Sequence, residues 1–155
     1  MADRKKTMRI ALAIAFTMAY PALSWYFSST AMEWYKTLEL PAFMPPAVLF
    51  PIVWGALYIL LALSFALYIA GENHSTGTVL LYILNGVLNP LWALVFFRHH
   101  NLFGAFFLLI GIFSLAVLIY KRTLEQNKTA AILLLPYILW LAFVLYLNYE
   151  TAFLN

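Results

Sequence analysis

Hydrophobic residues dominate five stretches of the chain, and none of the five contains Lys, Arg, Asp or Glu. The stretches cover residues 10–32, 40–71, 73–97, 99–120 and 129–149. An α-helix rises about 1.5 Å per residue, so about 20 apolar residues cross a hydrocarbon core of roughly 30 Å. Each stretch reaches that length. The pattern therefore predicts an all-α fold, an integral membrane bundle of five transmembrane helices.

One link between the spans is long, at residues 28–46, and we call it the lid loop. In it, Ser29 or Thr30 is positioned to cap a short helix that prolines then end. An amphipathic aromatic segment of this kind is expected at the membrane interface, across the mouth of the bundle. The other links leave no room for another domain, so residues 1–155 are expected to form a single domain. The expected spans are about residues 8–27, 47–70, 76–97, 101–121 and 129–149.

Charge is sparse and unevenly distributed. Only 10% of the residues are charged, against about 25% in soluble domains, and the net charge is +3. In an alternating five-span arrangement, Lys36 and Arg98 fall on one side of the membrane and the other basic residues on the opposite side. That second group is Arg4, Lys5, Lys6, Arg9, Lys121, Arg122 and Lys128. The bias predicts a cytoplasmic N-terminus and an outer C-terminus, and it is read as a topology signal rather than a nucleic-acid surface.

Small residues form a stripe along the first span. Ala11, Ala15, Ala19 and Ala22 recur at helical spacing. Small side chains let two helices approach closely in a membrane. The stripe predicts a face that packs against a neighbouring span, and it could also mediate dimerisation.

Two asparagines share a face of the third span with aromatic residues. Asn85, Asn89, Trp92 and Phe96 step by four, three and four positions, so they lie on one side of a helix. A buried amide is costly unless it finds a hydrogen-bond partner, so this face is expected to point into the bundle. There the amides either line a site or join neighbouring helices by hydrogen bonds.

Trp54 and Trp140 lie within the second and fifth spans, away from the interfacial belt where Trp is common. With Asn89 as a polar companion, they predict an apolar pocket with few polar groups, the usual composition of a small-molecule site. Flat aromatic walls favour a flat aromatic or polycyclic ligand. Simple packing of these rings is the alternative.

Four segments carry a family resemblance, in the right order and spacing. Residues 34–46 resemble the WYxxLxKPxFxPP signature of the TspO/MBR family, and the other three resemble its FxxxWxxLY, NxxWxxxFF and LLxPYxxWxxF…LN patterns. The segments read WYKTLELPAFMPP at 34–46, FPIVWGALY at 50–58, NPLWALVFF at 89–97 and LLPYILWLAF at 134–143, with LN at 147–148. The family comprises the tryptophan-rich sensory proteins and the translocator protein.

The resemblance implies a five-helix membrane bundle, usually a homodimer, with a pocket near the outer face beneath the lid loop. It implies tetrapyrroles such as porphyrin and haem, sterols such as cholesterol, and synthetic isoquinolines or benzodiazepines as ligands. Transferred by motif position, the ligand-binding residues are Trp34, Tyr35, Pro45, Trp54, Asn89, Trp92, Trp140 and Phe143.

The chain departs from the family pattern at two places. The usual basic residue before the lid proline is Leu40, so tetrapyrrole propionates would need Arg98, His99 or His100 on the same side. The sterol-recognition pattern needs Lys or Arg after its Tyr, and residues 150–155 contain neither. Sterol recognition through that motif is therefore unsupported.

The expected function is a ligand-binding or sensory membrane protein for porphyrin-like molecules, in the lipid bilayer, with no required cofactor. One alternative is an enzyme that degrades porphyrin with light and oxygen, for which the resemblance implicates Trp54 and Trp140. The sequence offers no acid–base pair, nucleophile or metal cluster for catalysis, and no cysteine. A tetrapyrrole or sterol transporter has less support, because charged residues within spans usually mark transport pathways and the five stretches carry no Lys, Arg, Asp or Glu.

Overall fold

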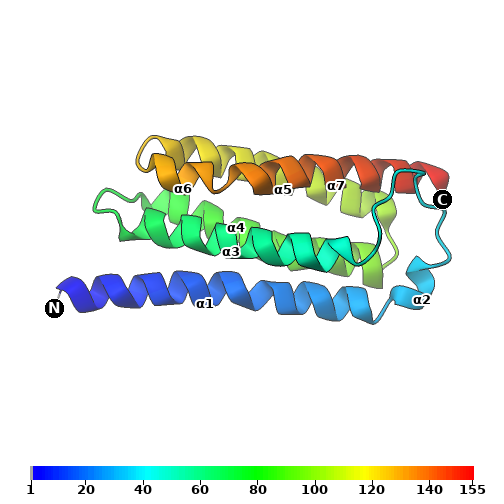
Figure 1. Cartoon of the computed structure of the whole chain (residues 1–155), viewed down its shortest axis with the longest axis horizontal. Coiled ribbons are helices and arrows are strands. Elements are labelled where there is room, and N and C mark those ends of the chain that lie inside the picture. The colour runs from blue at the N-terminus through cyan, green and yellow to red at the C-terminus, as the bar shows by residue number, and fades with distance from the viewer. Residues whose placement is uncertain (1) are drawn as a thin grey trace.

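A computed structural model describes residues 2–155, which form helices joined by short links (Figure 1). Five segments are long and apolar enough to cross a membrane. The predicted fold class, an all-α bundle of five spans with a short helix in the first link, is therefore confirmed. In chain order, the elements are α1 (Ala2–Ser29), α2 (Met32–Tyr35), α3 (Leu49–Ala70), α4 (Thr76–Ala93), the π-helix η1 (Leu94–Arg98), α5 (Leu102–Leu124), α6 (Lys128–Ile132) and α7 (Leu135–Leu154).

The fifth span contains a break that the single range 129–149 does not describe. Helix α6 ends at Ile132 and α7 begins at Leu135, so that Pro136 sits in the first turn of α7. Proline has no backbone N–H, and the first turn is the part of a helix where that N–H has no partner to lose. The proline therefore starts a new helix in the span.

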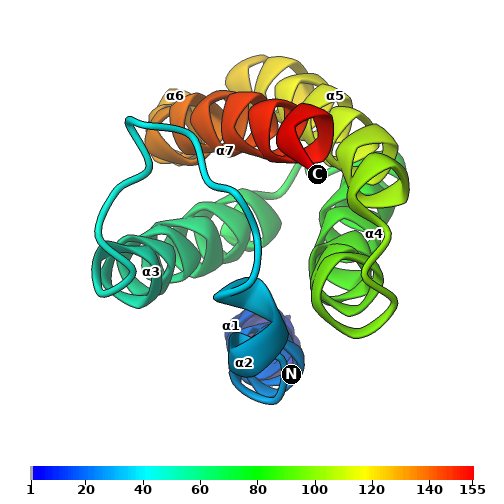
Figure 2. The ribbon, with the colours of Figure 1, turned by 90° about the vertical axis from the view of Figure 1, so that its right-hand side faces the viewer.

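The helices surround an interior that aromatic side chains occupy. Viewed from the end with the lid loop, α1 lies at the bottom, α3 at the left, α4 at the right, and α5 and α7 across the top (Figure 2). Helix α1 packs against α3 and α4, while α5 packs against α7 and α4. Contacts between α3 and α7 are few. Large residues such as Trp54 and Trp140 pack against the core between these helices.

The two ends of the bundle differ in charge. The start of α1, the α3–α4 link and the α5–α6 link lie at one end, while α2, the lid loop and the C-terminus lie at the other (Figure 1). The seven basic residues that the sequence groups together therefore share the first end, and Lys36 and Arg98 lie at the second. This agrees with alternating spans. Which end faces the cytoplasm stays a prediction from the charge count.

The alanine stripe of α1 does not pack against another span, so this prediction is wrong. Ala11, Ala15, Ala19 and Ala22 are all exposed. The buried face carries Ala13, Thr17 and Tyr20 instead. Residues 11 and 13 differ by about 200° around a helix of 3.6 residues per turn, so the two sets occupy opposite sides. On the inward face, Tyr20 buries more apolar area than an alanine of the stripe could. The alanine face remains open to a second copy of the chain.

A buried polar network joins four helices in the half of the bundle nearer the N-terminus. The Ser64 hydroxyl donates to the Ala130 carbonyl at 2.7 Å and lies 2.8 Å from the Tyr82 hydroxyl. Tyr82 Oη in turn lies 3.1 Å from Thr123 Oγ1. Polar groups inside a membrane must find partners within the protein. The network therefore fixes how α3, α4, α5 and α6 meet.

Candidate functional site

Helix α2 lies within the lid loop, but the predicted cap of this helix is wrong. The hydroxyls of Ser29 and Thr30 donate backward to the carbonyl of Tyr26, at 3.1 and 3.0 Å. Helix α2 starts after Ala31 and has no side-chain cap. The Tyr26 carbonyl also accepts the Thr30 N–H at 3.3 Å, and the Thr30 hydroxyl reaches the next carbonyl, that of Phe27, at 3.2 Å. The last carbonyls of a helix need such partners. The two hydroxyls terminate α1 rather than start α2.

The lid loop crosses the end of the bundle, from α2 to the end of α7 and then to α3 (Figure 2). Two contacts hold it against α7. The Glu39 N–H donates to Asn155 Oδ1, and Asn155 Nδ2 donates to the Glu39 carbonyl, both at 3.0 Å. The rings of Phe43 and Tyr146 stack with centroids 5.2 Å apart. These two contacts attach the middle of the lid loop to the C-terminal end of α7.

A group of aromatic rings, which we call the indole cluster, lies between α3 and α7. It comprises Trp54 and Phe50 from α3 with Trp140 and Phe143 from α7. The two indoles meet edge to face at 6.5 Å, Phe50 lies 5.9 Å from Trp140, and Phe143 lies 5.5 Å from Trp140. All four residues are only partly buried. The cluster is therefore an apolar, aromatic wall that keeps some access from outside the core.

The indole cluster contains a buried polar atom, the indole nitrogen Nε1 of Trp140, that lacks a hydrogen-bond partner among the described residues. A buried Trp N–H usually finds an acceptor, and leaving such a donor unpaired costs about 1–3 kcal/mol. An acceptor atom of a bound molecule would relieve that cost.

The asparagines of α4 are satisfied within the protein. Asn89 Nδ2 donates to the Tyr137 hydroxyl at 2.9 Å and to the Asn85 carbonyl at 2.9 Å. Tyr137 donates to Asn85 Oδ1 at 2.8 Å, and Asn85 Nδ2 donates to the Ile112 carbonyl at 3.2 Å. All three side chains are buried. Their arrangement ties α4 to α5 and α7, and it places Tyr137 with its ring centroid 6.4 Å from that of Trp54.

A second aromatic group, the lid cluster, joins α2 to the end of α4 and to η1. Trp34 stacks on His100 with centroids 3.9 Å apart and meets Phe96 at 5.9 Å. Tyr35 lies 6.4 Å from Phe96, and Trp92 lies 5.5 Å from it. Burial raises the pKa of the Tyr35 phenol above its ordinary value.

Six of the eight predicted binding residues fall into two groups, and Asn89 and Pro45 lie outside both. Trp54, Trp140 and Phe143 lie together in the indole cluster, whereas Trp34, Tyr35 and Trp92 lie in the lid cluster. Asn89 reaches the indole cluster only through Tyr137. Pro45 is partly buried in the lid loop just before α3.

An arginine and two histidines lie at the end of η1 and directly after it. Arg98, His99 and His100 are exposed, and His100 has a positive φ of 53°. On the lid, the Lys36 ammonium lies 2.7 Å from the Glu33 carboxylate and holds the pKa of that carboxyl below its ordinary value. Across residues 2–155, no group of three or more His, Cys, Asp or Glu is placed to hold a metal ion.

Open space lies elsewhere in the bundle. Two cavities of about 310 and 440 Å³ occupy the opposite end, and none of the eight predicted residues lines either of them.

Sequence reasoning passed over two polar residues that support the aromatic ones. The Trp92 indole N–H donates to Asn148 Oδ1 at 3.2 Å, and Asn148 Nδ2 donates to the Leu102 carbonyl at 3.1 Å. Tyr137 similarly holds Asn89. Tyr137 and Asn148 share the face of α7 that carries Trp140, at helical spacing, and this was the available signal. The spacing does not say which residue of another helix they meet.

Comparison with known proteins places this architecture in a family context. The chain matches the TspO/MBR family over residues 11–154. It is 34% identical over 125 residues to the tryptophan-rich protein TspO of Bacillus cereus, covering 79% of this chain and 80% of the relative. It is 32% identical to the TspO of Archaeoglobus fulgidus, covering 93% and 91%. It is 30% identical to the human translocator protein, covering 88% and 86%.

Proposed function

Because the chain belongs to the TspO/MBR family, as its motifs predicted, we propose that this multi-pass membrane protein is a ligand-binding sensor for porphyrin- and haem-like molecules. The ligand binds at the indole cluster between α3 and α7, beneath the lid loop. The observation that carries the proposal is the buried Trp140 N–H, a donor without a protein acceptor in an otherwise apolar aromatic wall.

The chemistry of the cluster suits a flat apolar guest. Indole and phenyl faces offer stacking area to a conjugated ring, and ring pairs of this kind contribute about 0.5–1.5 kcal/mol beyond area burial. The cluster carries no charged side chain, so an ionic group of the ligand must lie outside it. Asn89 holds Tyr137 in place and serves as a positioning residue rather than a direct contact.

The proposal is tested by titrating protoporphyrin IX into the purified protein in detergent micelles. Quenching of tryptophan emission and the porphyrin absorption band are followed together. We expect saturable binding of one porphyrin per chain. Uptake that rises linearly and matches protein-free micelles would contradict the proposal.

Orientation and assembly belong to the same proposal. The charge count puts the N-terminus in the cytoplasm and the lid loop on the outer side, so ligands arrive from outside or from the outer leaflet. The open alanine face of α1 supports a homodimer, because small residues allow close helix contact between two copies.

Arg98 is proposed to bind a porphyrin propionate. It is exposed at the lid end of the bundle, where Leu40 has replaced the basic residue usual in the family. Replacing Arg98 with alanine should weaken protoporphyrin IX about fivefold, as expected for one charge-assisted hydrogen bond near water, and should leave a neutral isoquinoline ligand unaffected. Both affinities are measured by titration. Lys36→Ala is the matched control, since it removes a charge at the same end. Equal losses for the two ligands would refute the role of Arg98.

Porphyrin degradation is the second candidate, and the edge-to-face contact of Trp54 and Trp140 at 6.5 Å favours it, since a porphyrin bound there would touch two oxidisable indoles. Illumination of the complex in air, with the Soret band followed over time, separates the two functions. An enzyme bleaches bound porphyrin faster than free porphyrin, and the Trp54→Phe, Trp140→Phe double variant loses that excess. Equal bleaching in all three samples leaves binding alone.

A further inference from the structure

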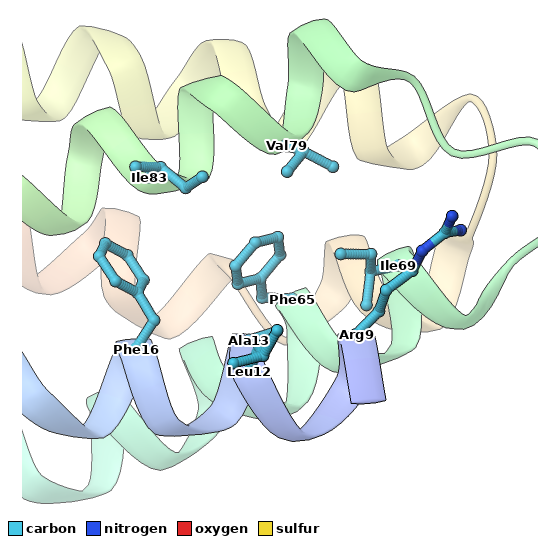
Figure 3. Close-up of a pocket in the computed structure, with 8 residues that line it drawn as sticks. All are labelled: Arg9, Leu12, Ala13, Phe16, Phe65, Ile69, Val79 and Ile83. Atoms are coloured by element: carbon cyan, nitrogen blue, oxygen red, sulfur yellow. The ribbon is translucent and has the colours of Figure 1, made fainter. Parts of the chain in front are cut away.

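An apolar groove runs between α1, α3 and α4 at the end of the bundle that holds the N-terminus (Figure 3). Its volume is about 310 Å³, at the lower end of the range of roughly 300–1,000 Å³ for ligand pockets. Most of its lining is hydrocarbon, from Leu12, Ala13, Phe16, Phe65, Val79 and Ile83. The small side chains of Ala13 and Val79 leave this space open, and the aromatic rings of Phe16 and Phe65 form part of its walls.

A polar cavity of about 440 Å³ adjoins this groove at the mouth, and the two share Arg9 and Ile69 in their linings. Lys6 and His74 add basic groups to the mouth, and Glu72 adds an acidic one. Neither Lys6 nor Arg9 forms an ion pair with a side chain that the structure describes. The mouth therefore presents two cations against one carboxylate, with the histidine Nδ1 held 2.7 Å from the Gly71 carbonyl.

We propose that the joined groove and mouth form a binding site for one anionic phospholipid, with an acyl chain in the groove and the phosphate at Arg9 and Lys6. This site lies at the opposite end of the bundle from the indole cluster and is independent of the function proposed above. The occupant is inferred from where the apolar lining and the basic residues lie. Hydrocarbon lies inside the span and positive charge at the span end, as in a phospholipid of the adjacent leaflet.

The dimensions agree with this occupant. Arg9 and Phe16 are seven residues apart, or roughly 10 Å along the helix axis. Half of the hydrocarbon core is roughly 15 Å, so an acyl chain whose headgroup sits at Arg9 extends past the whole groove. The guanidinium can hold a phosphate through two parallel hydrogen bonds. The anionic lipids of the cytoplasmic leaflet meet this end if the N-terminus is cytoplasmic, as the charge bias predicts.

The headgroup preference is tested by native mass spectrometry of the full chain in micelles with equal amounts of phosphatidylglycerol and phosphatidylcholine. We expect the wild-type protein to retain phosphatidylglycerol preferentially. Lys6→Gln with Arg9→Gln should lower that preference by about fivefold for each charge, since one basic residue near a membrane surface is worth about that factor. Arg4→Gln with Lys5→Gln removes the same charge from neighbouring positions outside both linings and should leave the preference intact. Equal retention of the two lipids, or equal losses in the two double variants, would overturn the site.

The acyl chain is tested by filling the groove. Ile83→Trp places a bulky ring in the lining, whereas Leu84→Trp adds the same ring at an exposed neighbour that does not line it. Retained phosphatidylglycerol should fall severalfold in the first variant and stay unchanged in the second. Glycerol 3-phosphate at the same concentration should not displace the lipid. Unchanged retention in Ile83→Trp, or displacement by glycerol 3-phosphate alone, would exclude an acyl chain in the groove.

Discussion

Replacing Trp140 with alanine is expected to weaken the binding of protoporphyrin IX by about thirtyfold, the factor that corresponds to the roughly 2 kcal/mol typical of a central aromatic contact. The substitution removes both a stacking surface and the unpaired N–H donor. Trp140→Phe keeps an aromatic ring and removes only the donor, so it should weaken binding by about fivefold, as for one neutral hydrogen bond. Binding is measured by the change in porphyrin absorption, which does not depend on the number of tryptophans.

Trp25→Ala provides the matched control for this experiment. Trp25 is also a membrane-span tryptophan, but it is 67% exposed on α1 and makes no contact with the indole cluster that the structure describes. Its loss should leave porphyrin affinity unchanged. Far-UV circular dichroism checks that each variant is folded. Wild-type affinity in folded Trp140→Ala and Trp140→Phe, or an equal loss in Trp25→Ala, would remove Trp140 from the site.

The spans were predictable because a membrane imposes one strong rule on the sequence. Stretches without charge must be helical, so their number and approximate bounds follow from counting. The break before Pro136 was not predictable in this way, because the hydrophobic pattern is the same on both sides of it. The π-helix η1 is similar: the His99 N–H bonds to the Leu94 carbonyl across five residues, a change of register that no residue pattern announces.

The inward faces were harder, and α1 and α4 illustrate why. In α4, exposing the amides of Asn85 and Asn89 to lipid would cost free energy, so the sequence allowed only one orientation of the helix. Both residues are buried, as that orientation requires. In α1, small and large apolar residues can both face a neighbour, so the alanine stripe gave no such penalty. Its exposure follows from which face offers more buried area, a property of the neighbouring helices.

The sequence identified which residues share a helix face near the site, but not which residues of other helices they contact. Helical spacing puts Tyr137, Trp140 and Asn148 on one face of α7. Their actual partners, Asn89 for Tyr137 and Trp92 for Asn148, depend on the relative depth of two helices. The position of one helix relative to another along the membrane normal is set by packing along the whole span, and it cannot be derived from a single sequence.

Replacing Gly86 with alanine is expected to destabilise the bundle by about 1–3 kcal/mol, the usual cost of overpacking a core. Gly86 lies where α4 approaches α1, and an added Cβ would come within 2.7 Å of Phe16 Cε1 and 2.8 Å of Tyr20 Cε1. Real Cβ atoms do not come so close, so both rings must move. Tyr20 has little freedom to do so, because it is buried and its ring also packs against that of Tyr58, at 5.4 Å.

Gly55→Ala is the control, since an added Cβ there meets nothing within 4 Å and alanine favours a helix more than glycine does. Stability is measured by unfolding in mixed micelles of increasing SDS content. Gly55→Ala should be at least as stable as the wild type. The cost of Gly86→Ala should fall by at least about 0.5 kcal/mol when Phe16 is replaced with leucine, because one of the two clashing rings is then gone. If the cost is the same in both backgrounds, or if Gly86→Ala is as stable as Gly55→Ala, then α1 and α4 do not meet at this glycine.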